Sequence, residues 1–230
     1  FAYAAAFAKG YTDSTVLWDV KTEFNPLCDP SAAATKDPSG QDCYHPKNYN
    51  GLFSGAVTMR QSLARSLNVP SVKTLYLAGI DTVIDLATRM GITTLTDRSR
   101  FGLSLVLGGA EVRPIDLVSA YGVFANDGVR VPWGFIQRIQ LNDGTILEER
   151  EITPERVLDT QTTRLMNDVL SDNSARSSVF GVNNSLYIPG RDVAAKTGTT
   201  QENRDAWVVG YTPSLSVGVW VGNNRNQSMT

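Results

Sequence analysis

The sequence predicts an α+β domain, in which an antiparallel sheet packs with helices and a mostly helical lobe precedes the sheet. Helical spacing of apolar residues dominates up to about residue 128, and alternating, β-branched segments follow it. Short turns rich in Gly, Pro, Asp and Ser join the later segments, as is typical of antiparallel strands. We therefore expect a helical lobe at residues 1–128 and a sheet-containing part at residues 129–230, within one domain.

Helices in the first part are expected to end at glycine or proline. Gly10, Gly79 and Gly91 stand where C-terminal caps are expected, and Pro70 disfavours helix at the residue before it. Pro114 is compatible with a helix because it falls in the first turn. Helices are expected at residues 1–9 (the back half of a longer one), 57–66 with Thr58 near its start, 71–78, 82–90 capped by Asp81, and 111–126, with a loop at 101–110.

The second part of the chain is expected to be rich in strands. Asp143-Gly144 separates two β-branched runs within residues 129–150 and predicts a hairpin turn there. Trp207, Tyr211 and Trp220 lie on later strands and are expected in the core. The remaining elements are expected to be a helix at residues 161–170 and strands at 192–199, 206–211 and 216–221.

The composition excludes some classes of protein. Lys plus Arg number 21 and Asp plus Glu number 23, so the net charge of -2 offers no basic surplus for a nucleic acid partner. No apolar run approaches the roughly 20 residues that span a bilayer. We therefore expect neither a nucleic-acid-binding protein nor a transmembrane segment within these residues.

The two cysteines, Cys28 and Cys43, lie in a segment at residues 25–50 whose composition predicts a long loop. In an extracytoplasmic protein, a disulfide between them would close this loop. Free thiols are an alternative. A metal site is a third, although it would have only three ligands even with His45, the sole histidine. Our prediction is a possible disulfide with no metal and no cofactor.

The strongest short motif is Lys196-Thr197-Gly198-Thr199, at the end of an apolar strand. Strand alternation places Lys196 and Gly198 on one face and the two threonines on the other. A lysine on an inner face is costly to bury unless it serves a site. The glycine leaves room for a ligand, threonine hydroxyls can hold a carboxylate, and an edge N–H can stabilise an oxyanion. An exposed strand end with a turn glycine is the alternative interpretation.

A second motif, Ser66-Leu67-Asn68, precedes Pro70, where a turn between two helices is expected. In such a turn Ser66 and Asn68 can face one cleft while Leu67 anchors the turn from below. Serine can relay a proton and asparagine can grip an amide. Taken alone, the triplet also fits a helix C-terminus with Asn68 in a left-handed cap. We predict that this turn and the Lys196 strand wall a common groove.

Together and in this order, the two motifs resemble those of class A penicillin-binding proteins, whose motif set also contains Ser-x-x-Lys. The resemblance extends over four blocks that cover most of the chain, at residues 44–72, 104–128, 194–213 and 219–224. It implies a β-lactamase/transpeptidase-like fold and a peptidoglycan D,D-transpeptidase that acts by serine acyl transfer. Peptidoglycan stem peptides and β-lactams are the ligands that it implies.

The resemblance also implies a role for each motif residue. Ser66 would pass a proton toward the leaving amine, and Lys196 would supply positive charge beside the nucleophile. Asn68 would hydrogen-bond the stem peptide or the β-lactam side chain. The hydroxyls of Thr197 and Thr199 would bind the substrate carboxylate. The backbone N–H of Thr199 would form half of the oxyanion hole, and Gly198 would keep the cleft clear.

The sequence departs from this family at the nucleophile, because residues 1–230 contain no Ser-x-x-Lys. Ser71-Val72-Lys73 has the wrong spacing. We expect the nucleophile just upstream of Phe1 and a further helix after Thr230, so that these residues alone are inactive. The resemblance further implies an extracytoplasmic location at the bacterial plasma membrane, with the anchoring helix upstream.

Other interpretations remain open at this point. A non-catalytic relative that binds peptidoglycan or a partner protein is the main alternative, and chance motif matches on an α+β domain are another. A literal Ser-Asp-Asn at residues 171–173 lacks the surrounding family pattern, and we interpret it as a chance match. Glu111, Asp116 and Asp205 are further acidic candidates, which we expect to be structural or solvated.

Overall fold

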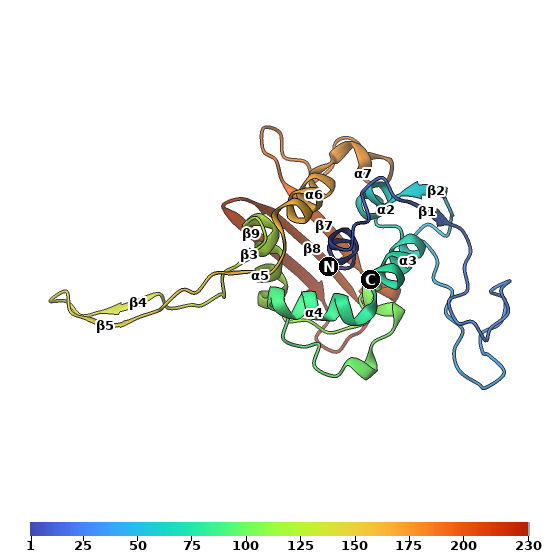
Figure 1. Cartoon of the computed structure of the whole chain (residues 1–230), viewed down its shortest axis with the longest axis horizontal. Coiled ribbons are helices and arrows are strands. Elements are labelled where there is room, and N and C mark those ends of the chain that lie inside the picture. Colours follow the sequence, from blue (N-terminus) through green and yellow to red (C-terminus); the bar gives the residue numbers. More distant parts are fainter. Residues whose placement is uncertain (230) are drawn as a thin grey trace.

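Helices cover one face of a three-stranded antiparallel sheet in the computed structural model, which describes residues 1–229 (Figure 1). The α+β class is therefore confirmed. No helix in this described part is long and apolar enough to cross a membrane. The α-helices are α1 (Ala2–Ala8), α2 (Met59–Arg65), α3 (Asn68–Ala78), α4 (Ile80–Met90), α5 (Pro114–Ala125), α6 (Thr160–Ser171) and α7 (Asn173–Phe180). The strands are β1 (Val16–Asp19), β2 (Gly55–Thr58), β3 (Val129–Arg130), β4 (Arg138–Gln140), β5 (Ile146–Glu149), β6 (Glu155–Arg156), β7 (Ala194–Thr199), β8 (Asp205–Thr212) and β9 (Leu215–Gly222).

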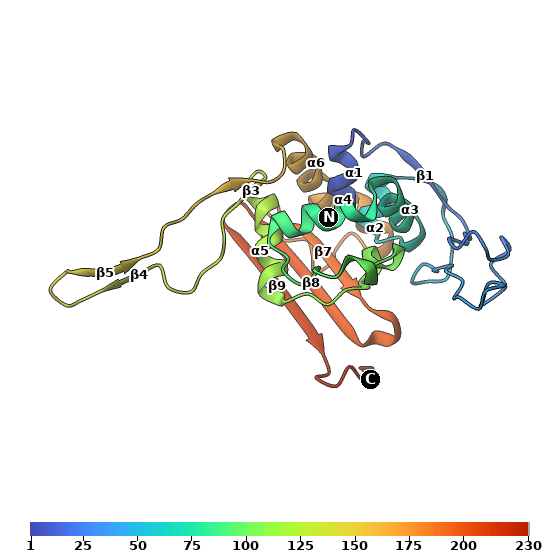
Figure 2. The same cartoon turned by 60° about the horizontal axis from the view of Figure 1, so that its bottom comes forward.

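The main sheet has the order β7-β8-β9, and the three late strands predicted from the sequence are confirmed. Helix α5 packs closely on β9, because a Cβ placed on Gly218 would lie 2.3 Å from Cγ2 of Val118. The opposite face of the sheet carries no helix within the described residues and exposes Val217, Val219 and Val221 (Figure 2). The division into lobes at residue 128 stays a prediction.

The N-terminal half differs from the prediction at two helix starts. Thr58 caps α2 through a capping box with Gln61, but Val57 belongs to β2, which pairs with an unpredicted β1. Helix α3 begins at Asn68 rather than Ser71. The reason is that Pro70 falls in the first helical turn, where its missing N–H removes no helical hydrogen bond.

Three further expectations on the helices were incomplete. Helix α4 begins directly after Gly79, so Asp81 lies inside its first turn and does not cap it. Residues Leu103–Leu107 form a short 3-10 helix in the expected loop. Helix α7 was not predicted, because six of its eight residues are polar or small and show no clear apolar face.

The predicted hairpin exists but lies at the tip of an arm. Strands β4 and β5 pair on either side of Asp143-Gly144, whereas β3 pairs with β6 nearer the body. The arm projects far from the helices and the sheet (Figures 1 and 2). On the main sheet Tyr211 is buried as expected, but Trp220 is 39% exposed, so the expectation of a core position for Trp220 was wrong.

The loop between β1 and β2 is closed by a disulfide between Cys28 and Cys43. Glu23 also holds this loop, since its carboxylate accepts hydrogen bonds from the N–H groups of Asn25 and Tyr44 and contacts Nδ1 of His45 at 2.8 Å. Burial alone would raise the pKa of Glu23, but these hydrogen bonds hold it below its ordinary value. His45 therefore has a structural partner.

Replacing both cysteines by serine is expected to lower the free energy of unfolding. The disulfide spans a separation of 15 residues. A loop of this size corresponds to roughly 3 kcal/mol of lost chain entropy in the unfolded state. Urea denaturation of the variant and of the chemically reduced wild type measures the effect. Equal midpoints for the oxidised wild type and the variant would contradict the expectation.

Candidate active site

The Ser66–Asn68 turn is formed by an abrupt change of backbone direction at Ser66. Helix α2 ends at Arg65, and Ser66 adopts the left-handed conformation with φ 58° and ψ 41°. Leu67 is extended and buried, so it anchors the turn as expected, and α3 begins at the next residue. The left-handed cap is thus Ser66 and not Asn68. A non-glycine residue in this region is uncommon and often marks a functional position.

Lys196 on β7 reaches this turn directly. Its Nζ donates a hydrogen bond to Oγ of Ser66 at 2.7 Å and another to the carbonyl oxygen of Thr197 at 2.8 Å. Burial and, to a smaller extent, the nearby positive charge of Arg176 together lower the pKa of Lys196 to about 8. The turn and the strand therefore adjoin, although the motifs are 130 residues apart, and a common groove between them stays a prediction.

Strand β7, which carries Lys196, is an edge strand of the sheet within the described residues. Thr200 donates its N–H to the carbonyl oxygen of Asp205, toward the neighbouring strand. By the alternation of an antiparallel ladder, the N–H groups of Thr197 and Thr199 point to the open edge. A Cβ built on Gly198 would meet only the Cβ of Trp207, at an ordinary 3.6 Å. Packing among the described residues therefore does not require glycine, and the space beside it is open.

Asn68 is held by the long loop rather than by Lys196. Its side-chain Nδ2 donates to the carbonyl oxygen of Lys47 at 2.7 Å, and its backbone N–H donates to Oδ1 of Asn48 at 2.8 Å. Because a carbonyl oxygen can only accept, the amide nitrogen of Asn68 is oriented toward the loop. The sequence motif alone did not indicate these two partners.

Arg176 is a second positive group near the site that the sequence analysis missed. The residue is 3% exposed and lies on α7, which packs against α2. Its Nη2 donates to the carbonyl oxygen of Leu170 at 2.6 Å, whereas Nη1 is buried without a hydrogen-bond partner in the described structure. Burial lowers the pKa of Arg176, opposed by the charge of Asp172. No sequence signal pointed to it, because α7 itself was not predicted.

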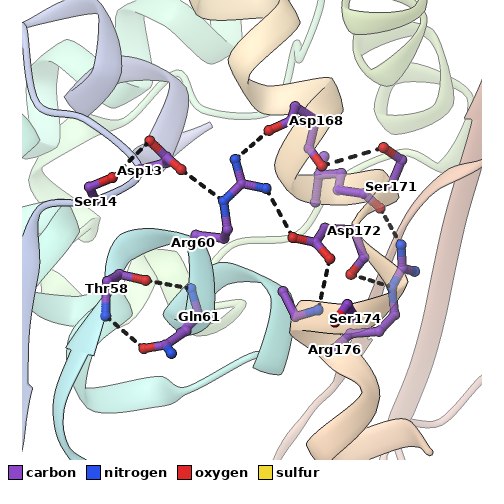
Figure 3. Close-up of polar contacts among 12 residues, drawn as sticks. Asp13, Ser14, Thr58, Arg60, Gln61, Asp168, Ser171, Asp172, Ser174 and Arg176 are labelled. Carbon is purple, nitrogen blue, oxygen red and sulfur yellow. Dashed lines mark hydrogen bonds and ion pairs between the residues drawn. The ribbon is translucent and has the colours of Figure 1, made fainter. Parts of the chain in front are cut away.

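Arg60 near the start of α2 joins three carboxylates from distant segments (Figure 3). Its Nε donates to Asp13 at 2.7 Å, its Nη1 donates to Asp172 at 3.0 Å, and its Nη2 pairs with Asp168. Asp172 also caps α7 by accepting the N–H of Ala175. This Arg60 cluster thereby fixes α2, which ends at Ser66, against α6 and α7.

The Ser171-Asp172-Asn173 triplet serves this junction. The Asp172 carboxylate binds Arg60 and the α7 N-terminus, and Nδ2 of Asn173 donates to the carbonyl oxygen of Val182. Burial alone would raise the pKa of Asp172, but the Ala175 N–H and the Arg60 charge hold it below its ordinary value. These contacts agree with our interpretation of the triplet as a chance match.

The other acidic candidates do not form a paired site. Asp116 accepts hydrogen bonds from Thr93 and Arg113, and Asp205 accepts one from Nε1 of Trp220. The Glu111 side chain is largely exposed and lies near Arg100. Each carboxylate therefore has its own local partner.

Replacing Arg176 by Gln is expected to raise the pKa of Lys196 above its value of about 8, because a neighbouring positive charge is removed. The folding stability of the wild type should rise between a pH of about 8 and the ordinary lysine pKa, because in that interval only the unfolded chain keeps the Lys196 proton. The variant should show a smaller rise. An NMR titration of the Lys196 side chain measures the pKa. Arg176→Lys keeps the charge and should keep the wild-type value, and Arg164→Gln is the surface control. An unchanged pKa in Arg176→Gln would refute the coupling.

An α+β scaffold with a lysine-bearing edge strand beside a Ser-x-Asn turn is the arrangement that penicillin-binding proteins share with class A β-lactamases. The chain belongs to the family of penicillin-binding transpeptidase domains, because the family model "Penicillin binding protein transpeptidase domain" matches residues 34–228. The chain is similar to penicillin-binding protein 1A of Aquifex aeolicus, at 35% identity over 99% of this chain and 29% of that protein. It is similar at 32% identity to penicillin-binding protein 1A of Neisseria meningitidis serogroup A, over 100% of this chain and 27% of that protein.

Solved structures show the same fold. The penicillin-binding protein PonA1 of Mycobacterium tuberculosis matches 98% of this chain and 59% of its own, with a TM-score of 0.79 and 26% identity. Penicillin-binding protein 1A of Haemophilus influenzae matches 98% of this chain and 37% of its own, with a TM-score of 0.78 and 25% identity. The 230 residues thus span less than a third of the curated relatives described above.

Proposed function

We propose that these residues form part of the active site of a peptidoglycan D,D-transpeptidase, which cross-links the bacterial cell wall and is acylated by β-lactams. The observation that carries the proposal is the hydrogen bond from Lys196 to Ser66, between the two motifs. The family membership and the similarity to penicillin-binding proteins support it. We place the enzyme on the outer face of the plasma membrane on the same grounds.

The reaction would be an acyl transfer through a serine ester. The nucleophile would come from a Ser-x-x-Lys outside these residues, since residues 1–230 contain none. Its oxygen attacks the carbonyl carbon of the penultimate D-alanine, the C–N bond breaks, and terminal D-alanine leaves with a proton. The amine of a second stem peptide then attacks the ester, which forms the cross-link and returns the serine hydroxyl.

Ser66 would relay the proton to the leaving amine. With a pKa of about 8, Lys196 is mostly protonated at neutral pH and can only donate a hydrogen bond. The Ser66 oxygen therefore accepts from Lys196 and keeps its own proton free to donate elsewhere. The hydroxyl proton is then directed onward, toward the leaving group. The positive charge also attracts the substrate carboxylate, for which Thr197 and Thr199 would supply hydroxyl donors. The open-edge N–H of Thr199 would donate to the oxyanion.

Fluorescent penicillin tests the proposal. The full-length protein that contains these residues should give a labelled band after denaturation, and unlabelled penicillin should compete for it. Residues 1–230 alone, at 25.0 kDa, should give none, because the nucleophile is absent. A full-length protein that carries a Ser-x-x-Lys and stays unlabelled would count against the proposal, as would a labelled band at the mass of the fragment.

A non-catalytic relative that binds peptidoglycan is the second candidate, favoured only by the absence of Ser-x-x-Lys from residues 1–230. For such a protein the full-length chain would sediment with purified peptidoglycan and show no penicillin label. Sedimentation that persists after Ser66 and Lys196 are replaced would support this candidate over the enzyme.

A further inference from the structure

Asn48 is a buried polar side chain in the loop between β1 and β2. It is 5% exposed, and its amide nitrogen donates to the Asp19 carboxylate at 2.8 and 3.0 Å and to the carbonyl oxygen of Leu52 at 2.8 Å. Its amide oxygen accepts the N–H of Asn68. A buried amide is stable only when its groups are paired in this way. Asn48 therefore links a fixed carboxylate to the Ser66–Asn68 turn.

Asp19 provides a rigid anchor for this link. It is fully buried at the end of β1, opposite Gly55 of β2, and also accepts the N–H of Ser54 at 2.8 Å. Lys73 of α3 extends to this end of β1, where its Nζ donates to the carbonyl oxygen of Trp18 at 2.6 Å. Hydrogen bonds to a charged acceptor are stronger than neutral ones, so the position of Asn48 is well defined.

Asn48 also supplies a hydrogen-bond acceptor that the N-cap residue of α3 lacks. The N-cap position is Leu67, whose side chain accepts no hydrogen bond, although the first N–H groups of a helix need acceptors from outside the helix. Oδ1 of Asn48 accepts the first of these, the N–H of Asn68. The preceding carbonyl of Lys47 accepts the side chain of the same Asn68. Two consecutive loop residues thus hold both the backbone and the amide of Asn68.

We propose that Asn48 is a positioning residue for substrate recognition, which acts through Asn68. By capping α3 it places the Lys47 carbonyl, and that carbonyl sets the direction in which Asn68 presents its amide to the ligand. The ligand group concerned is the acyl amide of an N-acyl peptide or of an acylamino β-lactam. This inference rests on the proposed function, together with the ligand that the family resemblance implies for Asn68.

The test compares two β-lactams in the full-length protein. Benzylpenicillin carries the acyl amide and 6-aminopenicillanic acid lacks it. Asn48→Ala should slow acylation by benzylpenicillin about tenfold, the effect of losing roughly one positioned hydrogen bond. It should slow acylation by 6-aminopenicillanic acid less than about twofold. Asn68→Ala should show the same preference, and the double variant should be no slower than Asn68→Ala, because both changes remove one interaction.

Asn50→Ala is the matched control, because Asn50 lies in the same loop, is exposed, and bonds only locally to the N–H of Leu52. It should behave as wild type with both ligands. Asn25→Ala loosens the loop at Asp37, which is not among the loop residues that hold Asn68, and should lower the melting temperature without changing the ratio of the two acylation rates. Equal slowing of both β-lactams by Asn48→Ala, or additive effects in the double variant, would overturn the inference. Failure of the wild type to be acylated at all would instead remove the proposed function.

Discussion

Replacing Lys196 by Met in the full-length protein is expected to reduce the rate of β-lactam acylation by at least about 100-fold, the lower range for loss of a positioned proton-transfer group. Methionine fills similar space but removes the ammonium group and its hydrogen bond to Ser66. It leaves the Ser66 hydroxyl without its donor and the substrate carboxylate without its cation. Stopped-flow acylation by a chromogenic cephalosporin measures the rate.

Lys36→Met is the control for this change, because Lys36 is an exposed lysine whose partner is Asp42 in the long loop. The Lys36→Met protein should be acylated at the wild-type rate. Because Lys196→Met removes a buried charge, its melting temperature should not fall. An acylation rate within threefold of wild type, in a folded Lys196→Met protein, would rule out the assigned role.

Replacing Gly128 by Ala is expected to cost about 3 kcal/mol or more of unfolding free energy, because strain and overpacking combine at this position. Gly128 follows α5 with φ +89°, and an added Cβ would lie 2.2 Å from the carbonyl oxygen of Leu158 and 2.8 Å from Oγ1 of Thr163. The first of these is a backbone atom of a residue just before α6. Urea denaturation measures the loss.

A Gly144→Ala variant distinguishes the cost of backbone strain from the cost of steric overlap. Gly144 has a similar φ of +91°, but the nearest atom to an added Cβ is Nε2 of Gln140 at 3.7 Å. Gly144→Ala should therefore cost only the left-handed penalty, about 1–2 kcal/mol. Equal losses for the two variants would show that the overlap at Gly128 is relieved by small movements and that the larger estimate is wrong.

Signals that span only a few residues, such as strand segments and turn dipeptides, predicted individual elements of the fold. The three late strands and the Asp143-Gly144 turn were confirmed, and Thr58 lies at the start of α2, near where a helix start was expected. The start of α3 was misplaced because a proline signal has two meanings, helix stop or first turn, and only the preceding Ser66 conformation decides between them. The exposed Trp220 was misjudged because strand propensity does not reveal which sheet face is covered.

The candidate site was predictable only as far as its motifs. Ser66 and Lys196 were expected together through a family resemblance, and their hydrogen bond agrees with that expectation. Asn48 and Arg176 had no comparable signal. Asn48 acts through partners 20 and 29 residues away, and Arg176 lies on a helix without an apolar periodicity. Spacing in a single sequence does not encode such contacts.

The Arg60 cluster has a consequence for the order in which the chain folds. Arg60 lies 112 residues before Asp172, and Ser66 lies 130 residues before Lys196. At roughly 5–20 residues per second, a ribosome needs on the order of 6–25 s to complete these separations, during which Arg60 has Asp13 but lacks Asp168 and Asp172, and Ser66 lacks Lys196. In a nascent chain stalled before Asp168, α2 should therefore be cleaved readily by protease. Once synthesis has passed Lys196 and the chain is released, α2 should be protected.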